Sequence, residues 1–446
     1  MFGKHLFPGG THPHEGRGGK LDNGGNAIVT LDPPSRVVIP MSQHIGAPAK
    51  AVVLKGDHVD IGQVIGEAGG FVSAPIHASV SGTVVSVEPT LLANGTSCPA
   101  VIIENDFKET WVELHPAEHP ETLTPAEVQK IVRDAGIVGL GGATFPTHVK
   151  LTPAQGKTIE KLIINGAECE PYLTADHRLM LEEPTKIVDG LRLLMLAFEV
   201  KEAVIGVEDN KPDAIAALTA AAAGVEGIRV QALPVRYPQG GEKQLVYAIT
   251  RRVVPNGGLP LDVGCVVCNV GTIYAIDQAI REGRPLIDRV TTVGGLVVQP
   301  ANYRVRIGTQ ISELIERSGG LRDDVKKLLS GGPMMGMAIE RTDIPVTKGC
   351  SGILALGREA LEPEESACIR CGRCMRACPM KLAPAKLDSL VRAGRLEAAE
   401  KNGVMNCLEC GACTYVCPAK RSLTQSCRTG KKIINTRRRQ AQAAKK

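Results

Sequence analysis

The chain has 446 residues, which is too many for one hydrophobic core, so its length predicts about three domains. Its net charge is a mild +5, and no run reaches about 18 consecutive apolar residues, which excludes an ordinary transmembrane helix. The first residues lack the apolar segment of a signal peptide. We therefore expect a cytoplasmic protein, in which a set of 14 cysteines points to metal ligands rather than to disulfides.

Residues 1–35 are rich in glycine, proline and histidine. His5, His12 and His14 could suggest a metal site, but their spacing is irregular and no cysteine lies nearby. The pattern favours an ordered arm that wraps on another domain over a metal centre.

Residues 36–104 alternate short Val/Ile runs with Gly-Asp and Ser-Gly turns, which predicts a small β-sandwich or barrel. The segments 56–63, 73–75 and 81–84 resemble a biotinyl/lipoyl-type barrel-sandwich domain. The hairpin that would present a modified lysine holds Gly-Gly-Phe at 69–71 instead. Without an attachment lysine, this module is expected to be structural.

An α/β pattern extends over residues 120–286. It begins with a capping box at 124–127, whose helix should end near Gly136. Further strands are expected at 162–165, 203–207 and 228–232, and helices near 176–198, 211–223 and 241–251. This alternation predicts a parallel, doubly wound sheet.

A glycine-rich stretch at 136–146 follows the first helix of this region. Glycines let the backbone approach a phosphate, and a helix N-terminus with Thr144 and Lys150 nearby would hold its negative charge. Glycine-rich turns without a ligand are also common, so this stretch alone leaves both interpretations open.

Two runs within a predicted domain at 360–430 share the spacing C-x2-C-x2-C-x3-C-P, which is typical of two-cluster bacterial ferredoxins. In such runs the fourth cysteine binds the other cluster. The predicted ligands are Cys368, Cys371, Cys374 and Cys417 for one [4Fe-4S] cluster, and Cys378, Cys407, Cys410 and Cys413 for the other. Zinc is the alternative, but two identical sets of four cysteines, each ending in proline, favour iron–sulfur.

Such clusters accept electrons singly, whereas NADH supplies two as a hydride, so a flavin must lie between them. Four segments of the α/β region occur in the order found in the NADH-binding flavoprotein subunit of respiratory complex I, which the chain resembles. They are the loop 139–146 with Lys150, and the segments 165–171, 240–242 and 268–272. Residues 287–345 resemble the β-grasp (SLBB-like) domain of that subunit.

The chain differs from that subunit at both ends. This chain starts with the barrel-sandwich module and ends with two cluster motifs. This arrangement, with residues 7–13 near the start, closely resembles the C subunits of Rnf ion-translocating ferredoxin:NAD oxidoreductases over nearly the whole chain. The resemblance implies an α/β protein with a doubly wound flavin-binding domain, a barrel-sandwich β module, a β-grasp domain and a C-terminal two-[4Fe-4S] ferredoxin domain.

The resemblance also implies binding residues. FMN would be held by Gly139, Gly141, Gly142, Thr144, Lys150, Asn165, Asn269 and Thr272. NAD(H) would meet Phe145, stacked on its nicotinamide or adenine ring, and the acidic residues Glu168, Glu170 and Glu242. A solvated loop or a helix cap is the alternative for these acidic residues. One position departs from the complex I subunit, where Asn stands in place of Cys268.

The implied function is NAD(H) oxidation or reduction within a membrane-bound complex that couples electron transfer to ion translocation. The implied partners are its other subunits, including a ferredoxin-like iron–sulfur subunit, but no nucleic acid. The implied location is peripheral, on the cytoplasmic side of the cell membrane. A cobalamin reductase-type soluble iron–sulfur flavoprotein and a non-catalytic electron-relay scaffold are the alternatives.

Residues 431–446 are a predicted basic tail, and the longer segment 418–446 has ten Lys or Arg and no Asp or Glu. No nucleic-acid recognition motif accompanies it, so a solvated tail or a contact with anionic lipid or an acidic neighbour is favoured. The remaining cysteines are expected to be small buried hydrophobes. They are Cys98, Cys169, Cys265, Cys268, Cys350 and Cys427.

Overall fold

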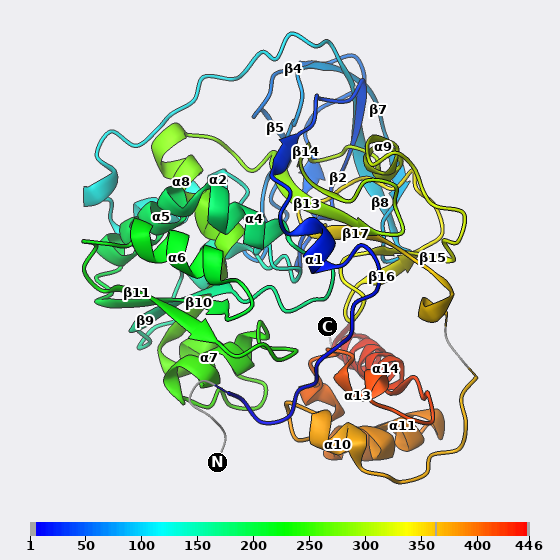
Figure 1. Ribbon diagram of the computed structural model, residues 1–446. Helices are drawn as coiled ribbons and strands as arrows, with labels where there is room; N and C mark the ends of the chain where they lie inside the picture. The colour runs from blue at the N-terminus through cyan, green and yellow to red at the C-terminus, as the bar shows by residue number, and fades with distance from the viewer. Residues whose placement is uncertain (1–5, 362–363, 444–446) are drawn as a thin grey trace.

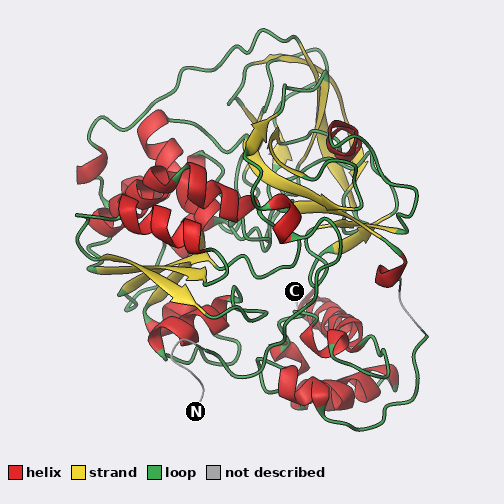
Figure 2. Cartoon of the chain, viewed as in Figure 1, coloured by secondary structure: helices red, strands yellow, loops and turns green. Residues whose placement is uncertain are grey.

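The computed structural model describes residues 6–361 and 364–443. Its strand-rich part packs beside a layered α/β domain, and a small helical domain lies below both (Figures 1 and 2). The strand-rich part holds two units, a two-sheet β module and a region built on a six-stranded sheet, so with the α/β and helical domains the predicted fold class is confirmed. Among the described residues, no helix combines the length and apolar character that crossing a bilayer requires.

The N-terminal β module consists of two antiparallel sheets. The first has the order β2-β8-β7-β4, with bounds Arg36–Pro40, Ser97–Asn105, Gly82–Leu91 and His58–Val59. The second has the order β3-β5-β6, with bounds Lys50–Ala51, Val64–Glu67 and Ile76–His77. Val37 and Ile39 of one sheet share a core with Ile65 and Ile76 of the other.

The hairpin that lacks an attachment lysine docks on the α/β domain. The rings of Phe71 and His148 lie edge to face, with centroids 6.1 Å apart. The Phe71 carbonyl oxygen is 3.2 Å from His148 Nε2. These contacts agree with a structural role for the module.

The α/β domain has a four-stranded, fully parallel sheet with the order β11-β10-β9-β12. The strands span Ile228–Leu233, Glu202–Glu208, Lys161–Gly166 and Cys265–Asn269. Its helices are α2 (Pro125–Asp134), α3 (Thr147–Lys150), α4 (Ala175–Glu182), α5 (Pro184–Ala197), α6 (Pro212–Ala221), α7 (Glu242–Thr250) and α8 (Val270–Glu282). Alternate strand residues face α5, α6 and α8 on one side and α7 on the other, as doubly wound folds require.

Local sequence signals explain where these helices begin. Thr124 accepts a hydrogen bond from the Glu127 backbone N–H, and Glu127 accepts one in return from the Thr124 N–H, so the predicted capping box is confirmed. The helix expected near 176–198 is two helices, α4 and α5. Pro184 occupies the first turn of α5, where proline is tolerated but cannot continue the preceding helix.

The β-grasp region is organised around a six-stranded sheet with the order β1-β14-β13-β17-β15-β16. Its strands are Ile28–Thr30, Ala301–Arg306, Asp288–Gly295, Gly352–Leu356, Lys327–Ser330 and Met337–Ile339, and α9 spans Ile311–Arg317. Two of these strands lie outside the range 287–345. Strand β1 comes from the N-terminal arm and pairs in parallel with β14, while β17 pairs with β13.

The C-terminal domain is helical. It contains α10 (Arg373–Ala377), α11 (Pro384–Arg392), α12 (Leu396–Lys401), α13 (Ala412–Tyr415) and α14 (Leu423–Ala443). Short helices elsewhere are α1 (Lys20–Asn23), η1 (Pro120–Thr122), η2 (Pro260–Val263), η3 (Arg358–Ala360) and η4 (Val404–Asn406). The described part of the predicted basic tail is therefore not a separate tail, because it continues α14.

The N-terminal arm joins the helical domain to the rest of the molecule (Figure 1, dark blue). The Gly10 backbone N–H donates to the Ala377 carbonyl at 2.9 Å, and Thr11 and Tyr237 exchange backbone hydrogen bonds of 2.8 and 2.9 Å. Phe7 is buried. The expected ordered arm is confirmed from residue 6 onward, whereas His5 lies outside the described residues.

Candidate cofactor sites

The carboxyl edge of the parallel sheet contains a topological switch point. From β9 the chain builds outward through β10 and β11, then crosses back to place β12 on the other side of β9. Open α/β sheets bind ligands at such a point. Asn165 lies one residue before the end of β9 and Asn269 ends β12, and these two residues are register partners. The structure thus brings together two side-chain amides that lie about 100 residues apart in sequence and that the resemblance implied as FMN contacts.

Both amides are held in place by the protein. Asn165 Nδ2 donates to the Gly240 carbonyl at 2.9 Å. Asn269 Nδ2 donates to Asp176 Oδ2 at 2.6 Å, and its Oδ1 accepts from the Gly271 N–H at the start of α8. The segments 165–171, 240–242 and 268–272 therefore converge on one edge of the sheet.

The glycine-rich loop covers this edge. The Leu140 N–H donates to Thr272 Oγ1 at 2.9 Å, and a Cβ on Gly141 would lie 3.3 Å from Asn269 Cβ. At Gly142 a Cβ would meet nothing within 4 Å, so that part of the loop faces open space. The helix after the loop, α3, is only one turn long, so it supplies a weaker dipole than the sequence suggested.

Lys150 lies at this edge in an ion pair. Its Nζ is 2.7 Å from Glu242 Oε1 and 3.1 Å from the Val267 carbonyl oxygen. Burial disfavours the charged ammonium, but the Glu242 carboxylate and the Cys268 thiol outweigh it, so the pKa of Lys150 is raised. The lysine therefore stays cationic beside the loop.

The other predicted acidic residues face different neighbours. Glu168 accepts from the backbone N–H groups of Asp176 and His177, and burial followed by the Asp176 carboxylate raises its pKa to about 8. Glu170 Oε1 lies 3.2 Å from the Tyr237 hydroxyl, and burial raises the Glu170 pKa to about 7. Phe145 is half-buried within the loop, where its carbonyl accepts from Gly139.

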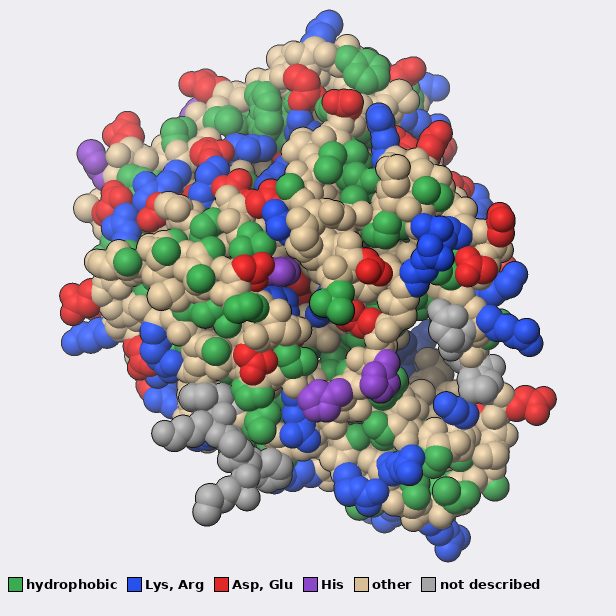
Figure 3. All heavy atoms as spheres, in the orientation of Figure 1, with side chains coloured by type: hydrophobic (Ala, Val, Ile, Leu, Met, Phe, Trp, Pro, Cys, Tyr) green, Lys and Arg blue, Asp and Glu red, His purple; other side chains and the backbone are tan. Residues whose placement is uncertain are grey.

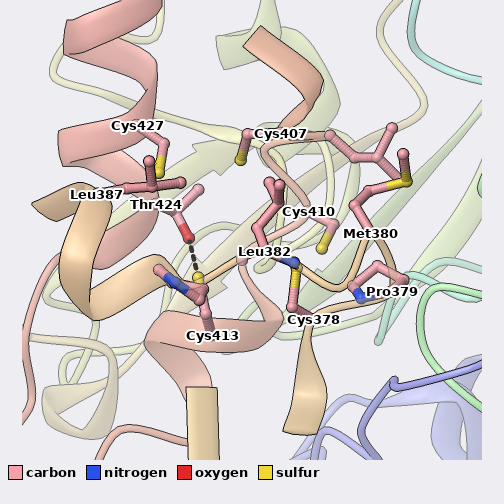
Figure 4. A pocket seen from close by; sticks show the side chains of 13 residues that line it. Cys378, Pro379, Met380, Leu382, Leu387, Cys407, Cys410, Cys413, Thr424 and Cys427 are labelled. Carbon is pink, nitrogen blue, oxygen red and sulfur yellow. Dashed lines mark hydrogen bonds between the residues drawn. The ribbon is translucent and has the colours of Figure 1, made fainter. Parts of the chain in front are cut away.

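One pocket, called here the inner cysteine site, is lined by one predicted ligand set (Figure 4). Its predicted ligands are Cys378, Cys407, Cys410 and Cys413. Cys378 comes from the first motif and the other three come from the second. Burial raises the pKa of Cys410 to about 12 and that of Cys413 to about 11, so these thiols would release protons on binding a cation.

A second pocket, the outer cysteine site, is lined by the other set: Cys368, Cys371, Cys374 and Cys417. Its surroundings are more open, because Cys368 and Cys371 are exposed and the neighbouring Ile369 is 67% exposed. Each pocket thus receives three cysteines from one motif and one from the other. That donor chemistry fits a [4Fe-4S] cubane in each pocket.

Of the six remaining cysteines, four are buried as expected, namely Cys265, Cys268, Cys350 and Cys427. Cys98 and Cys169 are only partly buried, so the expectation is wrong for these two. Cys265 and Cys268 lie three residues apart in β12 and pack into cores on opposite faces of the sheet, so they do not form a shared pair. Cys427, in contrast, lines the inner cysteine site, which the sequence did not predict. Its hydrogen bond with Cys407 lowers the pKa of Cys407 to about 7.

Tyr237 connects the carboxyl edge of the parallel sheet to the inner cysteine site. Its hydroxyl donates to the carbonyl oxygen of Cys410 at 2.6 Å. Three residues further along the chain, the Gly240 N–H lies 3.3 Å from Cys169 Sγ, and its carbonyl accepts from Asn165. This short segment contacts both candidate sites, yet no motif singled out Tyr237.

Comparisons with known domain families agree with this organisation. Residues 5–108 match the RnfC barrel sandwich hybrid domain, 132–278 the Nuo51 FMN-binding domain, 290–338 the SLBB domain and 361–418 the 4Fe-4S dicluster domain. The solved NAD+-reducing [NiFe]-hydrogenase in its H2-reduced state is a weaker likeness, with 19% identity and a TM-score of 0.49 over 70% of this chain and 65% of that chain.

Curated relatives match over almost the full length. The C subunit of the proton-translocating ferredoxin:NAD(+) oxidoreductase complex of Clostridium ljungdahlii is 49% identical, over 95% of this chain and 92% of that one. Its counterpart in the Na(+)-translocating complex of Acetobacterium woodii is 46% identical, over 98% and 99%. The counterpart in the ion-translocating oxidoreductase complex of Rhodobacter capsulatus is 45% identical, over 92% and 80%. The chain therefore belongs to the family of C subunits of ion-translocating ferredoxin:NAD oxidoreductase complexes.

Proposed function

We propose that this chain is the NAD(H)-handling subunit of its complex and that it carries electrons between NAD(H), FMN and two [4Fe-4S] clusters. The main support is the segment from Tyr237 to Glu242. Through Gly240 it contacts the carboxyl edge of the parallel sheet, which we call the flavin edge, and through Tyr237 it contacts the inner cysteine site. FMN supplies the needed chemistry, since it exchanges a hydride with NAD(H) and single electrons with clusters.

The edge of the parallel sheet fits FMN in shape and charge. The loop leaves open space at Gly142, and Lys150 offers a cation for a phosphate. Asn165 and Asn269 offer amides that can both donate and accept hydrogen bonds. The residues proposed to hold FMN are Gly139, Gly141, Gly142, Thr144, Lys150, Asn165, Asn269 and Thr272.

For NAD(H), we keep Phe145, Glu168 and Glu242 as the proposed contacts, because all three lie in segments that meet at the flavin edge. Glu170 has different neighbours from the other members of the predicted set. Its carboxylate accepts from the Met334 N–H at 3.1 Å and faces Tyr237, at the boundary with the helical domain. Its proposed contribution is to hold that boundary rather than to touch the nicotinamide.

We propose that the inner cysteine site receives electrons from the flavin and that the outer cysteine site exchanges them with a partner. Contacts with Tyr237, with Met334 and with the N-terminal arm all involve the inner site. The outer site instead presents exposed cysteines. Electron tunnelling requires the two centres to lie close together. The different surroundings therefore set the order of the centres: flavin, inner cluster, outer cluster and partner.

The proposed partner is an acidic iron–sulfur subunit of the same complex. Residues 364–443 include 16 Lys or Arg and 6 Asp or Glu, and basic side chains gather over the helical domain at the bottom of Figure 3. Among the described residues, Arg370 and Arg373 beside the outer site form no ion pair, and the nearby Ile369 and Met375 are exposed. Exposed basic and apolar side chains together suit transient docking of an acidic surface.

We place the chain peripherally on the cytoplasmic side of the membrane, bound through other subunits. NAD(H) is a cytoplasmic electron carrier, and the relatives belong to complexes named as ion-translocating. The described part of α14 directs Arg437 and Arg438 to Glu397 and Glu400. Those two arginines are therefore partly neutralised within the domain and are weak candidates for a lipid contact.

The test is anaerobic titration of the purified chain with NADH, followed by visible and EPR spectroscopy. We expect flavin bleaching together with reduced-cluster signals. Absence of flavin and of any bleaching would favour the scaffold alternative, and NADH-dependent reduction of cobalamin would favour the cobalamin reductase alternative.

A matched variant locates the flavin. Gly141→Val places a branched side chain against Asn269, so we expect loss of FMN and of NADH oxidation while both clusters remain. Gly25→Val is a suitable control, because Gly25 is exposed, its φ is not positive and a Cβ there meets nothing within 4 Å. Full flavin content and normal turnover in Gly141→Val would contradict this placement.

A further inference from the structure

The inner cysteine site is bordered by one face of helix α14. Thr424 and Cys427 lie three residues apart, so they share a face of the helix, and both line the pocket (Figure 4). Thr424 is 9% exposed and Cys427 is 1% exposed. Neither residue belongs to the predicted ligand set.

Thr424 is positioned to donate a hydrogen bond to a ligand sulfur. Its Oγ1 lies 3.4 Å from Cys413 Sγ. The same Oγ1 accepts from the Thr414 hydroxyl at 2.9 Å, while the Thr424 backbone N–H donates to Thr414 Oγ1 at 2.9 Å. This pair of contacts leaves the Thr424 hydroxyl proton for Cys413. A cysteine bound to a cluster is a thiolate and can only accept a hydrogen bond, so the Thr424 hydroxyl must be the donor.

Cys427 makes the corresponding contact with Cys407, to which its side chain is hydrogen-bonded. Cys407 Sγ also accepts from the Glu409 backbone N–H at 3.3 Å, and Cys378 Sγ accepts from the Leu382 N–H at 3.4 Å. Backbone donors cannot be exchanged by mutation, whereas the hydroxyl and the thiol can. One turn after Cys427, Lys431 Nζ donates to the Cys407 carbonyl at 3.0 Å.

The outer cysteine site differs in this respect. Among the described residues, no hydrogen bond reaches the sulfur of Cys368, Cys371, Cys374 or Cys417. Its cysteines are also more exposed. Hydrogen bonds to sulfur are one of the factors that set the reduction potential of a cluster.

We propose that Thr424 and Cys427 are positioning residues of α14 that raise the reduction potential of the inner cluster by donating hydrogen bonds to Cys413 and Cys407. Reduction adds one electron to the cluster and increases negative charge on its sulfurs, so donors stabilise the reduced form. This inference rests on the proposed function, because it requires a cluster in the inner site.

The test uses the full chain with its cofactors, and measures the midpoint potential of each cluster by EPR-monitored redox titration. Thr424→Val and Cys427→Ala should each shift the inner-cluster potential downward, with a larger shift in the double variant. Thr424→Ser and Cys427→Ser retain a donor and should stay nearer the wild type. The midpoint potential of the outer cluster should not change, so that cluster serves as an internal control.

Thr429→Val is the matched control, since Thr429 lies on α14, is exposed and does not line the pocket. A wild-type chain with no inner cluster would contradict the proposed function itself. Unchanged potentials in Thr424→Val and Cys427→Ala, with full iron content, would overturn only the inference.

If a variant loses iron, the wild type remains informative. Exchange into D2O should alter the proton hyperfine couplings of the reduced inner cluster more than those of the outer cluster. Equal effects on both clusters would overturn the inference.

Discussion

The inner and outer cysteine sites have the same ligand spacing but opposite surroundings. The inner site is enclosed by the N-terminal arm, by Tyr237 and by helix α14. The outer site has exposed cysteines, an exposed Ile369 and unpaired arginines among the described residues. Two motifs of the same spacing thus have different surroundings, set by the contacts that the rest of the chain makes. In the proposed relay, this difference assigns the inner cluster to the flavin and the outer cluster to the partner.

The largest expected effect comes from removing single ligands. Cys374→Ala and Cys413→Ala should each lower the iron content by about four per chain, because loss of a thiolate usually loses the cubane. The first should abolish only the outer-cluster EPR signal and the second only the inner one. Loss of both signals in either variant, or iron content unchanged at about eight per chain, would contradict the crossed ligand assignment.

The arm offers a second way to separate the sites. A Cβ on Gly9 would lie 2.7 Å from the Cys378 carbonyl oxygen, and its φ of +80° adds strain of about 1–2 kcal/mol for alanine. Gly9→Ala should slow reduction of the inner cluster by NADH in stopped-flow measurements, without loss of FMN. Gly25→Ala is the control, because a Cβ there meets nothing within 4 Å. Equal rates in both variants would show that the arm does not position the inner site.

Charge reversal tests the outer site. Arg373→Glu should lower the rate of electron transfer to an acidic iron–sulfur partner on the order of tenfold at low ionic strength, and less at high ionic strength. Lys432→Glu changes charge equally at an exposed position of α14 outside both pockets. A similar loss in Lys432→Glu would point to net charge rather than to a docking surface beside the outer site.

The smallest expected effect concerns pH and the boundary at Glu170. Burial raises the Glu170 pKa to about 7, above that of an unfolded glutamate, so the folded chain holds this proton more tightly. Its contribution to stability is complete at low pH and falls as pH rises from about 4.5 to about 7. The melting temperature of Glu170→Gln should therefore fall less than that of the wild type between about pH 4.5 and pH 7. Exposed Glu88→Gln is the control, and identical pH slopes in all three chains would contradict the role given to burial.

Much of the architecture followed from local sequence patterns. The capping box at Thr124, the alternation that gave β9, β10 and β11, and the ordered arm are confirmed by the structure. The fold class is also confirmed. These features depend on neighbouring residues or on a regular period, which a single sequence displays directly.

The remaining features depend on contacts between distant residues. The Tyr237 hydroxyl donates a hydrogen bond to a residue 173 positions away, so no local sequence pattern could identify Tyr237. Cys427 lacks the motif spacing, and only the course of α14 brings it to Cys407. The parallel pairing of β1 with β14 was missed because Ile28–Thr30 is too short to display a strand period. For the candidate site, the sequence predicted which segments take part, whereas only the parallel sheet of the structure shows that they lie side by side.

The most direct test of the relay is rapid-freeze EPR of Cys374→Ala and Cys378→Ala after mixing with NADH. If the inner site lies between the flavin and the outer site, Cys374→Ala will still show rapid reduction of its inner cluster. Cys378→Ala will bleach its flavin but leave the outer cluster oxidised on the same timescale. Rapid reduction of the outer cluster in Cys378→Ala would contradict the account, because electrons would then reach the surface without passing through the inner site.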